Sequence, residues 1–331
     1  MRVRARWVVL GLVLVVLLVP AGALTFARLV SPGGGFWVRA VAYTPFAIPL
    51  YAVAFLLLLV ALITTRRGWR TLAAVLTVLS VIGLALHLYW VRGPYTGPED
   101  IASPGDPTVR VMTLDLRQGL ADPARVVGLA VHDDVDVLVL QEVTARELAA
   151  MDGAGLDKAY SHLAGSPAEG AAGTMVFSRY ELGEAARLPT GLASYAMDVQ
   201  APGADVHLLA VHARQPSGDA SAWAQDQAAI AQAAADANDP TVVIGDFNAT
   251  LDHAAMRRLL DDGFRDAADT ANSRWQPTWP SAGQVSVLGF AEPSVLALDH
   301  VLVSGRVRVL HTATVQVPGT DHRALLAILS L

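Results

Sequence analysis

The chain has 331 residues, a formal net charge of −6 at pH 7 and no cysteine. The lack of cysteine excludes a disulfide framework and any site that binds metal through thiolates. All 30 acidic residues lie at or after Glu99, and nine arginines precede it, so residues 1–98 carry +9 whereas the rest, with 15 basic against 30 acidic residues, carries −15. The sequence therefore contains two parts of opposite chemistry.

Three apolar stretches, residues 7–26, 41–63 and 72–90, predict transmembrane helices. None of them contains Asp, Glu, Lys or Arg, and each is close to the roughly 20 residues needed to cross a bilayer. Pro45 and Pro49 are expected to kink the second helix, which membrane helices tolerate. We therefore expect residues 1–92 to form a membrane anchor of three helices.

The charges of the loops predict how this anchor is oriented. Three arginines precede the first stretch and three more, including Arg66, lie in the loop of residues 64–70, whereas the intervening loop has only Arg28 and Arg39 at its edges. Because short arginine-rich loops stay in the cytoplasm, the chain after Arg92 is predicted on the extracytoplasmic side of the cell membrane. Residues 1–23 also match a cleavable signal peptide, and cleavage would leave that prediction unchanged.

Residues 93–107 are rich in proline, glycine and acidic residues, which predicts a linker. From residue 108 onward, short β-branched runs alternate with helical stretches. Because strands outnumber helices, residues 108–331 are expected to form an α/β domain with two packed sheets flanked by helices. Strands are expected at 109–114, 135–140, 174–178, 206–211, 241–244, 298–303, 307–315 and 324–329, and helices at 121–131, 144–151, 221–237 and 252–262, the last two capped by Ser221 and Asp252.

Polar side chains gather where the predicted strands stop. Taken singly, each of them fits an ordinary strand end or turn, because Asp, Asn and Gly favour turns. Together they fit convergence on a cation, because carboxylates and imidazoles are costly to bury alone. In chain order they are Thr113 and Asp115, Gln141 and Glu142, His212, residues 245–248, Asp299 and His300, and residues 320–323.

These residues, in this order, resemble the endonuclease/exonuclease/phosphatase superfamily, which includes DNase I-like nucleases, sphingomyelinases and inositol-phosphate phosphatases. The resemblance covers residues 108–331. It implies a four-layered α/β sandwich with Mg²⁺ or Mn²⁺ at the mouth between the two sheets. The matching motifs are VMTLDLRQG (111–119), LQE (140–142), FSRY (177–180), VHA (211–213), GDFN (245–248), PTWP (277–280), LDHVLVS (298–304) and TDHR (320–323).

The resemblance also implies a metal site. Glu142 is the expected principal ligand, and Asp321 is expected at or near the metal. Asp115 stands where the family usually has Asn. An additional carboxylate there is expected to join the metal ligands and to bind the metal more tightly, while it would repel a phosphate oxygen that the amide would have donated to.

The same resemblance implies the catalytic residues. Asp246 is expected to orient the attacking water or to act as a base, and Asn248 to hold a phosphate oxygen. His322 is expected to contact the scissile phosphate, with its imidazole oriented by Asp299. His212 is expected to stabilise the phosphate or assist the leaving group.

The predicted setting favours a phosphate presented at the membrane surface. The acidic domain holds one lysine, Lys158, which disfavours nucleic acid because lysine and arginine contacts to phosphates supply most non-specific affinity. Three helices followed by this domain also resemble membrane proteins associated with teicoplanin resistance, for which the implied substrate is undecaprenyl pyrophosphate. We therefore expect a metal-dependent hydrolase of phosphoester or phosphoanhydride bonds on a lipid-linked phosphate, with the lipid bilayer as its partner and no protein partner.

Two alternatives stay open at the level of the sequence. One is an extracytoplasmic nuclease, which would need a basic stripe across its cleft. The other is a catalytically silent domain that binds phosphorylated ligands as a sensor.

Overall fold

The computed structural model describes residues 2–64, 67–98, 100–101, 105–281, 283–284, 286–287 and 290–331. Arg66, Glu99 and residues 102–104 of the predicted linker lie outside the described residues. The chain divides into two compact units, Met1–Arg92 and Gly93–Leu331.

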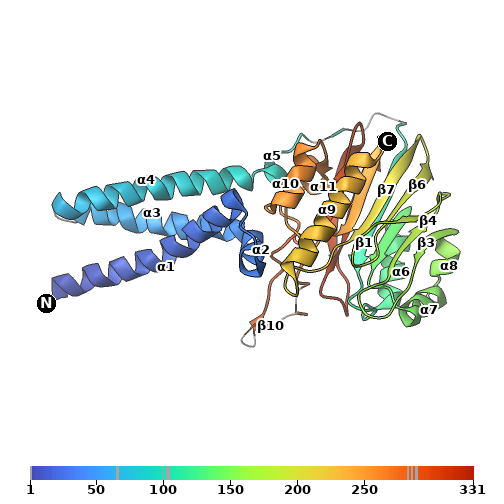
Figure 1. Ribbon diagram of the computed structural model, residues 1–331, viewed down its shortest axis with the longest axis horizontal. Helices are drawn as coiled ribbons and strands as arrows, with labels where there is room; N and C mark the ends of the chain where they lie inside the picture. Colours follow the sequence, from blue (N-terminus) through green and yellow to red (C-terminus); the bar gives the residue numbers. More distant parts are fainter. Residues whose placement is uncertain are drawn as a thin grey trace. The chain divides into compact units, whose positions relative to one another are not determined.

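The first unit is built of helices (Figure 1). Three of them are long and apolar enough to cross a membrane, over Arg6–Val30, Thr44–Thr64 and Trp69–Trp90, which confirms the three predicted apolar helices. The elements are α1 (Arg2–Val30), α2 (Gly35–Ala42), the 3₁₀ helix η1 (Thr44–Phe46), α3 (Ala47–Thr64) and α4 (Arg67–Trp90).

The second predicted helix differs from the expectation of one kinked element. The chain forms α2, a turn at Tyr43, η1 and then α3. Pro45 lies in η1, and Pro49 is the third residue of α3. In the first turn of a helix a backbone N–H has no carbonyl partner, so the donor that proline lacks removes no hydrogen bond. The two prolines therefore lie where α3 starts rather than within it.

Polar side chains join the three long helices to one another. Thr25 Oγ1 of α1 lies 2.8 Å from the Tyr51 hydroxyl of α3 and 2.9 Å from His87 Nε2 of α4. Gly83 of α4 faces the Tyr51 ring, since a Cβ at this position would lie 2.5 Å from Tyr51 Cζ. Small residues permit such close approach of helices in membranes.

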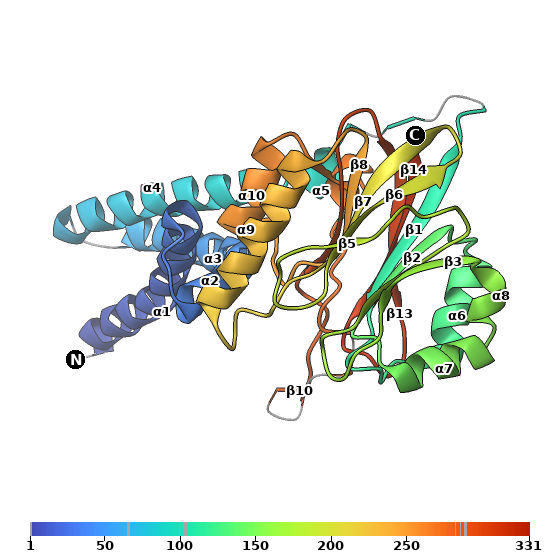
Figure 2. The ribbon, with the colours of Figure 1, turned by 45° about the vertical axis from the view of Figure 1, so that its right-hand side comes forward.

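The second unit contains the two packed sheets that the sequence predicts (Figure 2). The first sheet has the order β13-β14-β1-β2-β4-β3, and the second has the order β5-β6-β7-β8-β12-β9. β1 and β2 are parallel, as are β7 and β8, whereas the other neighbours are antiparallel. The strands are β1 (Thr108–Asp115), β2 (Val137–Gln141), β3 (His162–Ser166), β4 (Thr174–Ser178), β5 (Ala186–Arg187), β6 (Tyr195–Ala201), β7 (Ala204–His212), β8 (Thr241–Asp246), β9 (Arg265–Asp266), β12 (Asp299–Val303), β13 (Arg308–Gln316) and β14 (Arg323–Ser330), with β10 (Ser286–Val287) and β11 (Phe290–Ala291) in a separate small hairpin.

Helices cover the outer faces of both sheets and complete a four-layered α/β sandwich (Figure 2). The first sheet is covered by α6 (Pro123–His132), α7 (Ala145–Gly153) and α8 (Leu156–Ala159), and the second by α9 (Ala220–Asp236) and α10 (Ala254–Asp261). The two remaining helices are short, α5 (Gly93–Thr96) and α11 (Ala267–Thr270).

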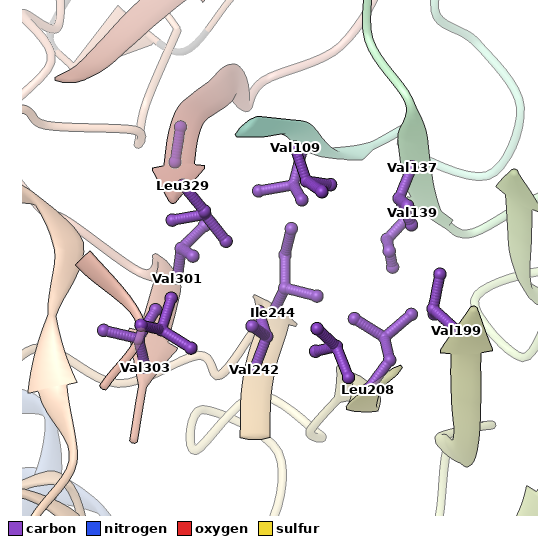
Figure 3. Packing of buried hydrophobic residues seen from close by; sticks show 14 of the residues in the cluster. Val109, Val137, Val139, Val199, Leu208, Val242, Ile244, Val301, Val303 and Leu329 are labelled. Atoms are coloured by element: carbon purple, nitrogen blue, oxygen red, sulfur yellow. The ribbon is translucent and has the colours of Figure 1, made fainter. Parts of the chain in front are cut away.

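Two buried cores explain why the central strands are almost continuously apolar. Val109 and Val111 of β1 face the core between the sheets, which is rich in valine (Figure 3). Met112 and Leu114 of the same strand face the core under α6, α7 and α8. A strand that is buried on both faces needs apolar residues at successive positions, not only at alternate ones.

All eight predicted strands and all four predicted helices of this unit are present, but both predicted N-caps are wrong. The N-cap of α9 is Asp219, whose carboxylate accepts hydrogen bonds from the backbone N–H groups of Ser221 and Ala222. The N-cap of α10 is His253 rather than Asp252. Asp219 outcompetes Ser221 because one carboxylate satisfies two of the free N–H groups of the first turn.

Residues of the segment predicted as a linker are bonded to the rest of the second unit. The Pro94 carbonyl of α5 accepts a hydrogen bond of 2.7 Å from the Arg274 backbone N–H. The Asp100 carboxylate accepts one of 3.0 Å from the Val309 backbone N–H, and Asp106 pairs with Arg308. These contacts shorten the part of residues 93–107 that can act as a free spacer.

Candidate active site

The predicted site residues come together at one edge of the two sheets. The carboxyl ends of parallel strands lie at the same edge, and the register pairs Asp115 of β1 with Gln141 of β2, and His212 of β7 with Asp246 of β8. Strand β12 runs antiparallel to β8, so its first residue, Asp299, lies opposite Asp246. Each sheet therefore delivers polar side chains to this edge.

Two buried triads join the side chains of both sheets. Ligand atoms of Asp115, His212 and Asp246 all lie within 4.8 Å of one another, and so do those of Asp246, Asp299 and His322. His212 Nε2 lies 3.6 Å from Asp115 Oδ2 and 4.0 Å from Asp246 Oδ2. All five side chains are buried. Asp246 belongs to both triads and is therefore the centre of the cluster.

The turn after β8 holds Asp246 and Asn248 against each other. Asp246 Oδ1 accepts from the Asn248 backbone N–H, and its Oδ2 accepts from Asn248 Nδ2, both at 2.7 Å. Gly245 permits the close approach of β7, because a Cβ there would lie 2.0 Å from the Val211 carbonyl oxygen. The turn is therefore fixed by local hydrogen bonds and by a glycine that no larger residue can replace without a shift of the backbone.

His322 is held by Asp299. Its Nδ1 lies 2.9 Å from Asp299 Oδ2, which leaves Nε2 for another partner. The hydroxyl of Thr278 accepts from the Leu298 and Asp299 backbone N–H groups at 3.0 and 3.2 Å. The hydroxyl of Thr320 donates to the Asp115 carbonyl at 2.7 Å and accepts from the His322 backbone N–H at 3.0 Å. Two buried threonines thus fix the segments that carry the pair.

Glu142 lies beside the triads and is held by a loop with unusual backbone angles. Its Oε2 accepts a hydrogen bond of 2.6 Å from the Gln118 backbone N–H, and Asp115 Oδ1 accepts one of 2.7 Å from the Arg117 backbone N–H. Arg117 and Gln118 have φ of 49° and 55°, a left-handed conformation that non-glycine residues adopt rarely. This conformation aims two successive N–H groups at the two carboxylates. Among the described residues, Glu142 is a member of neither triad.

Burial raises the pKa of three carboxyl groups of the site, those of Asp115, Asp246 and Glu142. It raises the pKa of Asp115 to about 8, and the charges of Glu142 and Asp299 contribute in the same direction, against that of His322. It also raises the pKa of Asp246 well above its usual range. For Glu142, burial again raises the pKa, while the Gln118 hydrogen bond opposes the rise. Burial therefore makes the ionised forms of these carboxyl groups unfavourable.

The two histidines have opposite shifts. Burial, and after it the charge of His322, lower the pKa of His212 to about 3. Burial lowers the pKa of His322 as well, but the charge and hydrogen bond of Asp299, together with the charges of Asp246 and Asp115, outweigh burial and hold the pKa well above its usual value. The site therefore favours the neutral form of His212 and the protonated form of His322.

Asp321 occupies the rim. Its Oδ1 lies 3.7 Å from Arg117 Nε, and its Oδ2 accepts a hydrogen bond of 3.4 Å from Trp279 Nε1. Neither triad of the described residues includes it. Both of its oxygens thus face side chains of neighbouring loops.

The residues present fit a divalent cation. Within the part of the chain that the structure describes, Asp299 Oδ1 and His212 Nδ1 are buried without a hydrogen-bond partner. Burial raises the pKa of Asp115 and Asp246, because the charged forms of these two carboxyl groups lack sufficient compensation in the buried cluster. A hard cation with carboxylate ligands relieves such a cost.

Helix α9 supports the site through residues that the sequence analysis did not single out. Trp223 Nε1 donates to the Asn248 carbonyl at 3.1 Å, and Gln227 Nε2 donates to the Phe247 carbonyl at 2.6 Å. Both side chains are buried and lie four positions apart on one helical face. The available signal was that two polar residues, Asp226 and Gln227, lie among the apolar positions of the buried face of α9. His300, which was grouped with the site residues, instead bonds Asp266 and the Ala249 carbonyl away from the triads.

The fold is shared with solved structures of low sequence identity. Zebrafish (D. rerio) TDP2, complexed with a single-strand DNA product, has a TM-score of 0.58 and 14% identity, and the match covers 68% of this chain and 100% of that one. An endonuclease/exonuclease/phosphatase from Bacteroides vulgatus has a TM-score of 0.52 and 18% identity over 68% and 99% of the two chains. One from Beutenbergia cavernae has a TM-score of 0.50 and 21% identity over 68% and 72%.

The family model gives the assignment. None of the curated proteins is similar to the chain at a significant level. The model of the endonuclease/exonuclease/phosphatase family matches residues 112–322, which is more than half of the chain and includes every predicted site residue. Together with the buried Asp and His cluster at the sheet edge, this match shows that the chain belongs to the endonuclease/exonuclease/phosphatase family.

Proposed function

We propose that the protein is a Mg²⁺- or Mn²⁺-dependent hydrolase of phosphoester or phosphoanhydride bonds at the extracytoplasmic face of the membrane. The observation that carries this proposal is that His322, with Nδ1 held 2.9 Å from Asp299 Oδ2, lies beside a cluster of buried carboxylates around Asp246. Phosphoryl transfer needs positioned charge and a proton donor more than it needs covalent chemistry from the protein.

Each side chain of the site has a proposed role. Asp115 and Glu142 would hold the cation, which when bound supplies positive charge that offsets the charge developing on the phosphate oxygens. Asp246 orients the attacking water and accepts its proton. His322, with Nδ1 held by Asp299, presents the proton on Nε2 to a phosphate or leaving-group oxygen.

Two further side chains complete the proposed machinery. Asn248 donates both Nδ2 hydrogens, one to Asp246 and one to the Ala213 carbonyl, so its amide fixes the Asp246 carboxylate, and one of these hydrogens would have to move to a phosphate oxygen when substrate binds. His212, neutral because of its lowered pKa, can donate a hydrogen bond without adding charge and thereby stabilise the phosphate or the leaving group. Neutral donors are suited to a site that already binds a cation.

The proposed substrate is a lipid-linked phosphate, such as undecaprenyl pyrophosphate. Three helices long enough to span a membrane precede the domain, and the loop arginines favour an extracytoplasmic domain. Residues 93–107 allow little free reach, because part of the segment is hydrogen bonded to the domain. The site would therefore meet phosphates at the membrane surface.

A substrate panel tests the proposal. We expect the purified full-length protein with Mg²⁺ to release phosphate from undecaprenyl pyrophosphate, and the Glu142→Ala and His322→Ala variants to lose at least about a hundredfold in rate. An Arg125→Gln variant, changed at an exposed position of α6, is the control. A folded protein that binds phosphorylated lipid without turnover would instead support the sensor.

The same panel separates a nuclease from a phosphatase. Single-stranded DNA is included because the similar TDP2 structure contains a DNA product. Release of nucleotides from DNA but no phosphate from the lipid would overturn the lipid assignment while leaving a metal-dependent hydrolase.

A further inference from the structure

The guanidinium group of Arg117, at the rim of the site, has only a distant ion-pair partner among the described residues. Arg117 follows β1, and its side chain is 39% exposed. Within the described part of the chain, Asp321 Oδ1 is the one carboxylate oxygen within 4 Å of its guanidinium, and the 3.7 Å from Nε is too long for a hydrogen bond. Its two terminal nitrogens are therefore available to a ligand.

The other arginines next to site segments differ in this respect. Arg146 donates Nη2 to the Gly119 carbonyl at 3.0 Å. Arg214 forms two hydrogen bonds with the carboxylate of Asp226, and Arg323 donates to the carbonyl and hydroxyl oxygens of Thr314. Structural hydrogen bonds hold these three guanidinium groups, whereas Arg117 is held by one long ion pair.

Arg117 lies at the Glu142 end of the site, and its charge lowers the pKa of Glu142 against the larger effect of burial. Its backbone N–H bonds Asp115, and the next N–H in the chain bonds Glu142. Its ion-pair partner, Asp321, directly precedes His322 in the chain and also accepts a hydrogen bond from Trp279. Asp321 thus links the loop that carries Arg117 to the loop that carries the imidazole.

We propose that Arg117, positioned by Asp321, is a specificity-determining residue that binds a second phosphate attached to the scissile one, so that the site selects diphosphates. This inference rests on the proposed hydrolase function, because it assigns a substrate class to the same site. His322 and Asn248 serve the scissile phosphate, and Arg117 serves its neighbour. A guanidinium offers two parallel N–H donors that match the oxygens of a phosphate.

The proposal gives Asp321 a role different from that of a metal ligand. Its two oxygens face Arg117 and Trp279, so its carboxylate holds the guanidinium in place. The Asp321→Asn variant, which keeps the shape and an acceptor, is therefore expected to weaken diphosphate binding and leave Mg²⁺ affinity unchanged.

A binding experiment tests the inference independently of turnover. Full-length protein in detergent with Mg²⁺ is titrated with imidodiphosphate, whose P–N–P bridge resists hydrolysis, and with inorganic phosphate. In Arg117→Gln we expect about tenfold weaker binding of imidodiphosphate, the loss of one charge-assisted contact, and less than a twofold change for phosphate. Arg117→Lys should recover part of the loss, and Arg125→Gln, with the same change of charge, should bind as the wild type does.

The outcomes distinguish this inference from the proposed function. Equal losses for both probes in Arg117→Gln, the same loss in Arg125→Gln, or no binding of imidodiphosphate to the wild type would overturn the role of Arg117. If the wild type discriminates between the probes through Arg117 but hydrolyses no substrate in the panel, the inference stands and the proposed hydrolysis fails. A thermal melt of each variant identifies those that are misfolded, and Arg117→Lys then carries the test.

Discussion

At the scale of single residues, Asp115 lowers the stability of the metal-free fold but provides a carboxylate that can bind a cation. The residue is 3% exposed and its pKa is raised to about 8, because burial penalises the charged form. Without a cation, the native protein therefore keeps Asp115 protonated at neutral pH, and binding a cation would release that proton. Asparagine, the residue that the family resemblance leads us to expect at position 115, has nearly the same shape as aspartate but cannot carry this charge.

We predict that Asp115→Asn changes the pH dependence of stability in the metal-free protein. The unfolded carboxyl titrates near 3.9 and the folded one at a raised pKa, so the unfolded state gives up a proton that the native state keeps. Below about pH 4 both proteins should have the same free energy of unfolding. Between about pH 4 and pH 8 the wild type should lose on the order of a few kcal/mol relative to the variant, and above that range the difference should stay constant.

Urea unfolding in EDTA, repeated across this pH range, measures the difference in the free energy of unfolding between the wild type and Asp115→Asn. The variant keeps an acceptor for the Arg117 backbone N–H, so local structure is retained. A difference that does not vary with pH would contradict the assigned shift. In Mg²⁺ the order should reverse, because a cation that binds only the native state stabilises the wild type more.

At the scale of elements, the positions of strands were easier to predict than the supports of the site. The central positions of β2 and β8, residues 137–140 and 242–244, are continuously apolar because both faces of these strands are buried. Strand β3 was missed because it lies at a sheet edge and is mostly half-exposed, and β6 was missed although Met197, Val199 and Ala201 alternate with exposed residues. The polar residues at the ends of buried strands were predictable because the register of a parallel sheet brings those ends together.

The loop of residues 116–119 was not predictable in the same way. Its function depends on positive φ angles at Arg117 and Gln118, and neither residue type signals that conformation. Support from α9 was partly signalled, because Gln227 is a polar residue among the apolar positions of its helical face. Its partner, the Phe247 carbonyl 20 positions away, is known only from the coordinates.

We predict that Gln227→Leu slows turnover more than it unfolds the domain. The substitution preserves size but leaves the buried Phe247 carbonyl without its donor, which costs about 1–3 kcal/mol, and it loosens the turn that carries Asp246 and Asn248. The rate on the best substrate should fall about tenfold, because small displacements of catalytic groups are costly. Gln232→Leu, at an exposed position of the same helix, should change neither property; an equal loss in that variant would contradict a role for the turn.

For the first unit, we predict that Gly83→Ala destabilises the helix bundle. A methyl group there would lie 2.5 Å from the Tyr51 ring, so the helices must separate or the ring must move, at a cost of about 1–3 kcal/mol. The melting temperature in detergent should fall, whereas Gly11→Ala, where a Cβ meets nothing within 4 Å, should leave it unchanged. Equal melting temperatures for the two variants would rule out close packing at Gly83.

At the scale of the whole molecule, the opposite charges of the two parts favour one topology. The arginines before the first candidate span and in the loop of residues 64–70 favour a cytoplasmic location for those segments. If all three candidate helices span the membrane, as we propose, the domain lies on the other side. The acidic domain that follows contains the site.

The absence of cysteine makes this topology directly testable. We expect a membrane-impermeant maleimide to label Ser217→Cys, an exposed position before α9, in intact cells. Thr64→Cys, at the end of α3, should be labelled only after the membrane is permeabilised. The reverse pattern would place the domain in the cytoplasm and remove extracytoplasmic lipid phosphates from the possible substrates.

Strand β14 has a consequence for how the molecule is made. It is the last strand in chain order, yet it lies between β13 and β1 in the interior of its sheet, and it pairs with the first strand, β1. His322 directly precedes it, so the second triad of the site cannot form until residues 323–330 have joined the sheet. During synthesis the site can therefore form only after residues 323–330 have been made, and under the proposed topology only after they have crossed the membrane. The cation would then be acquired after export, from the medium outside the cell rather than from the cytoplasm.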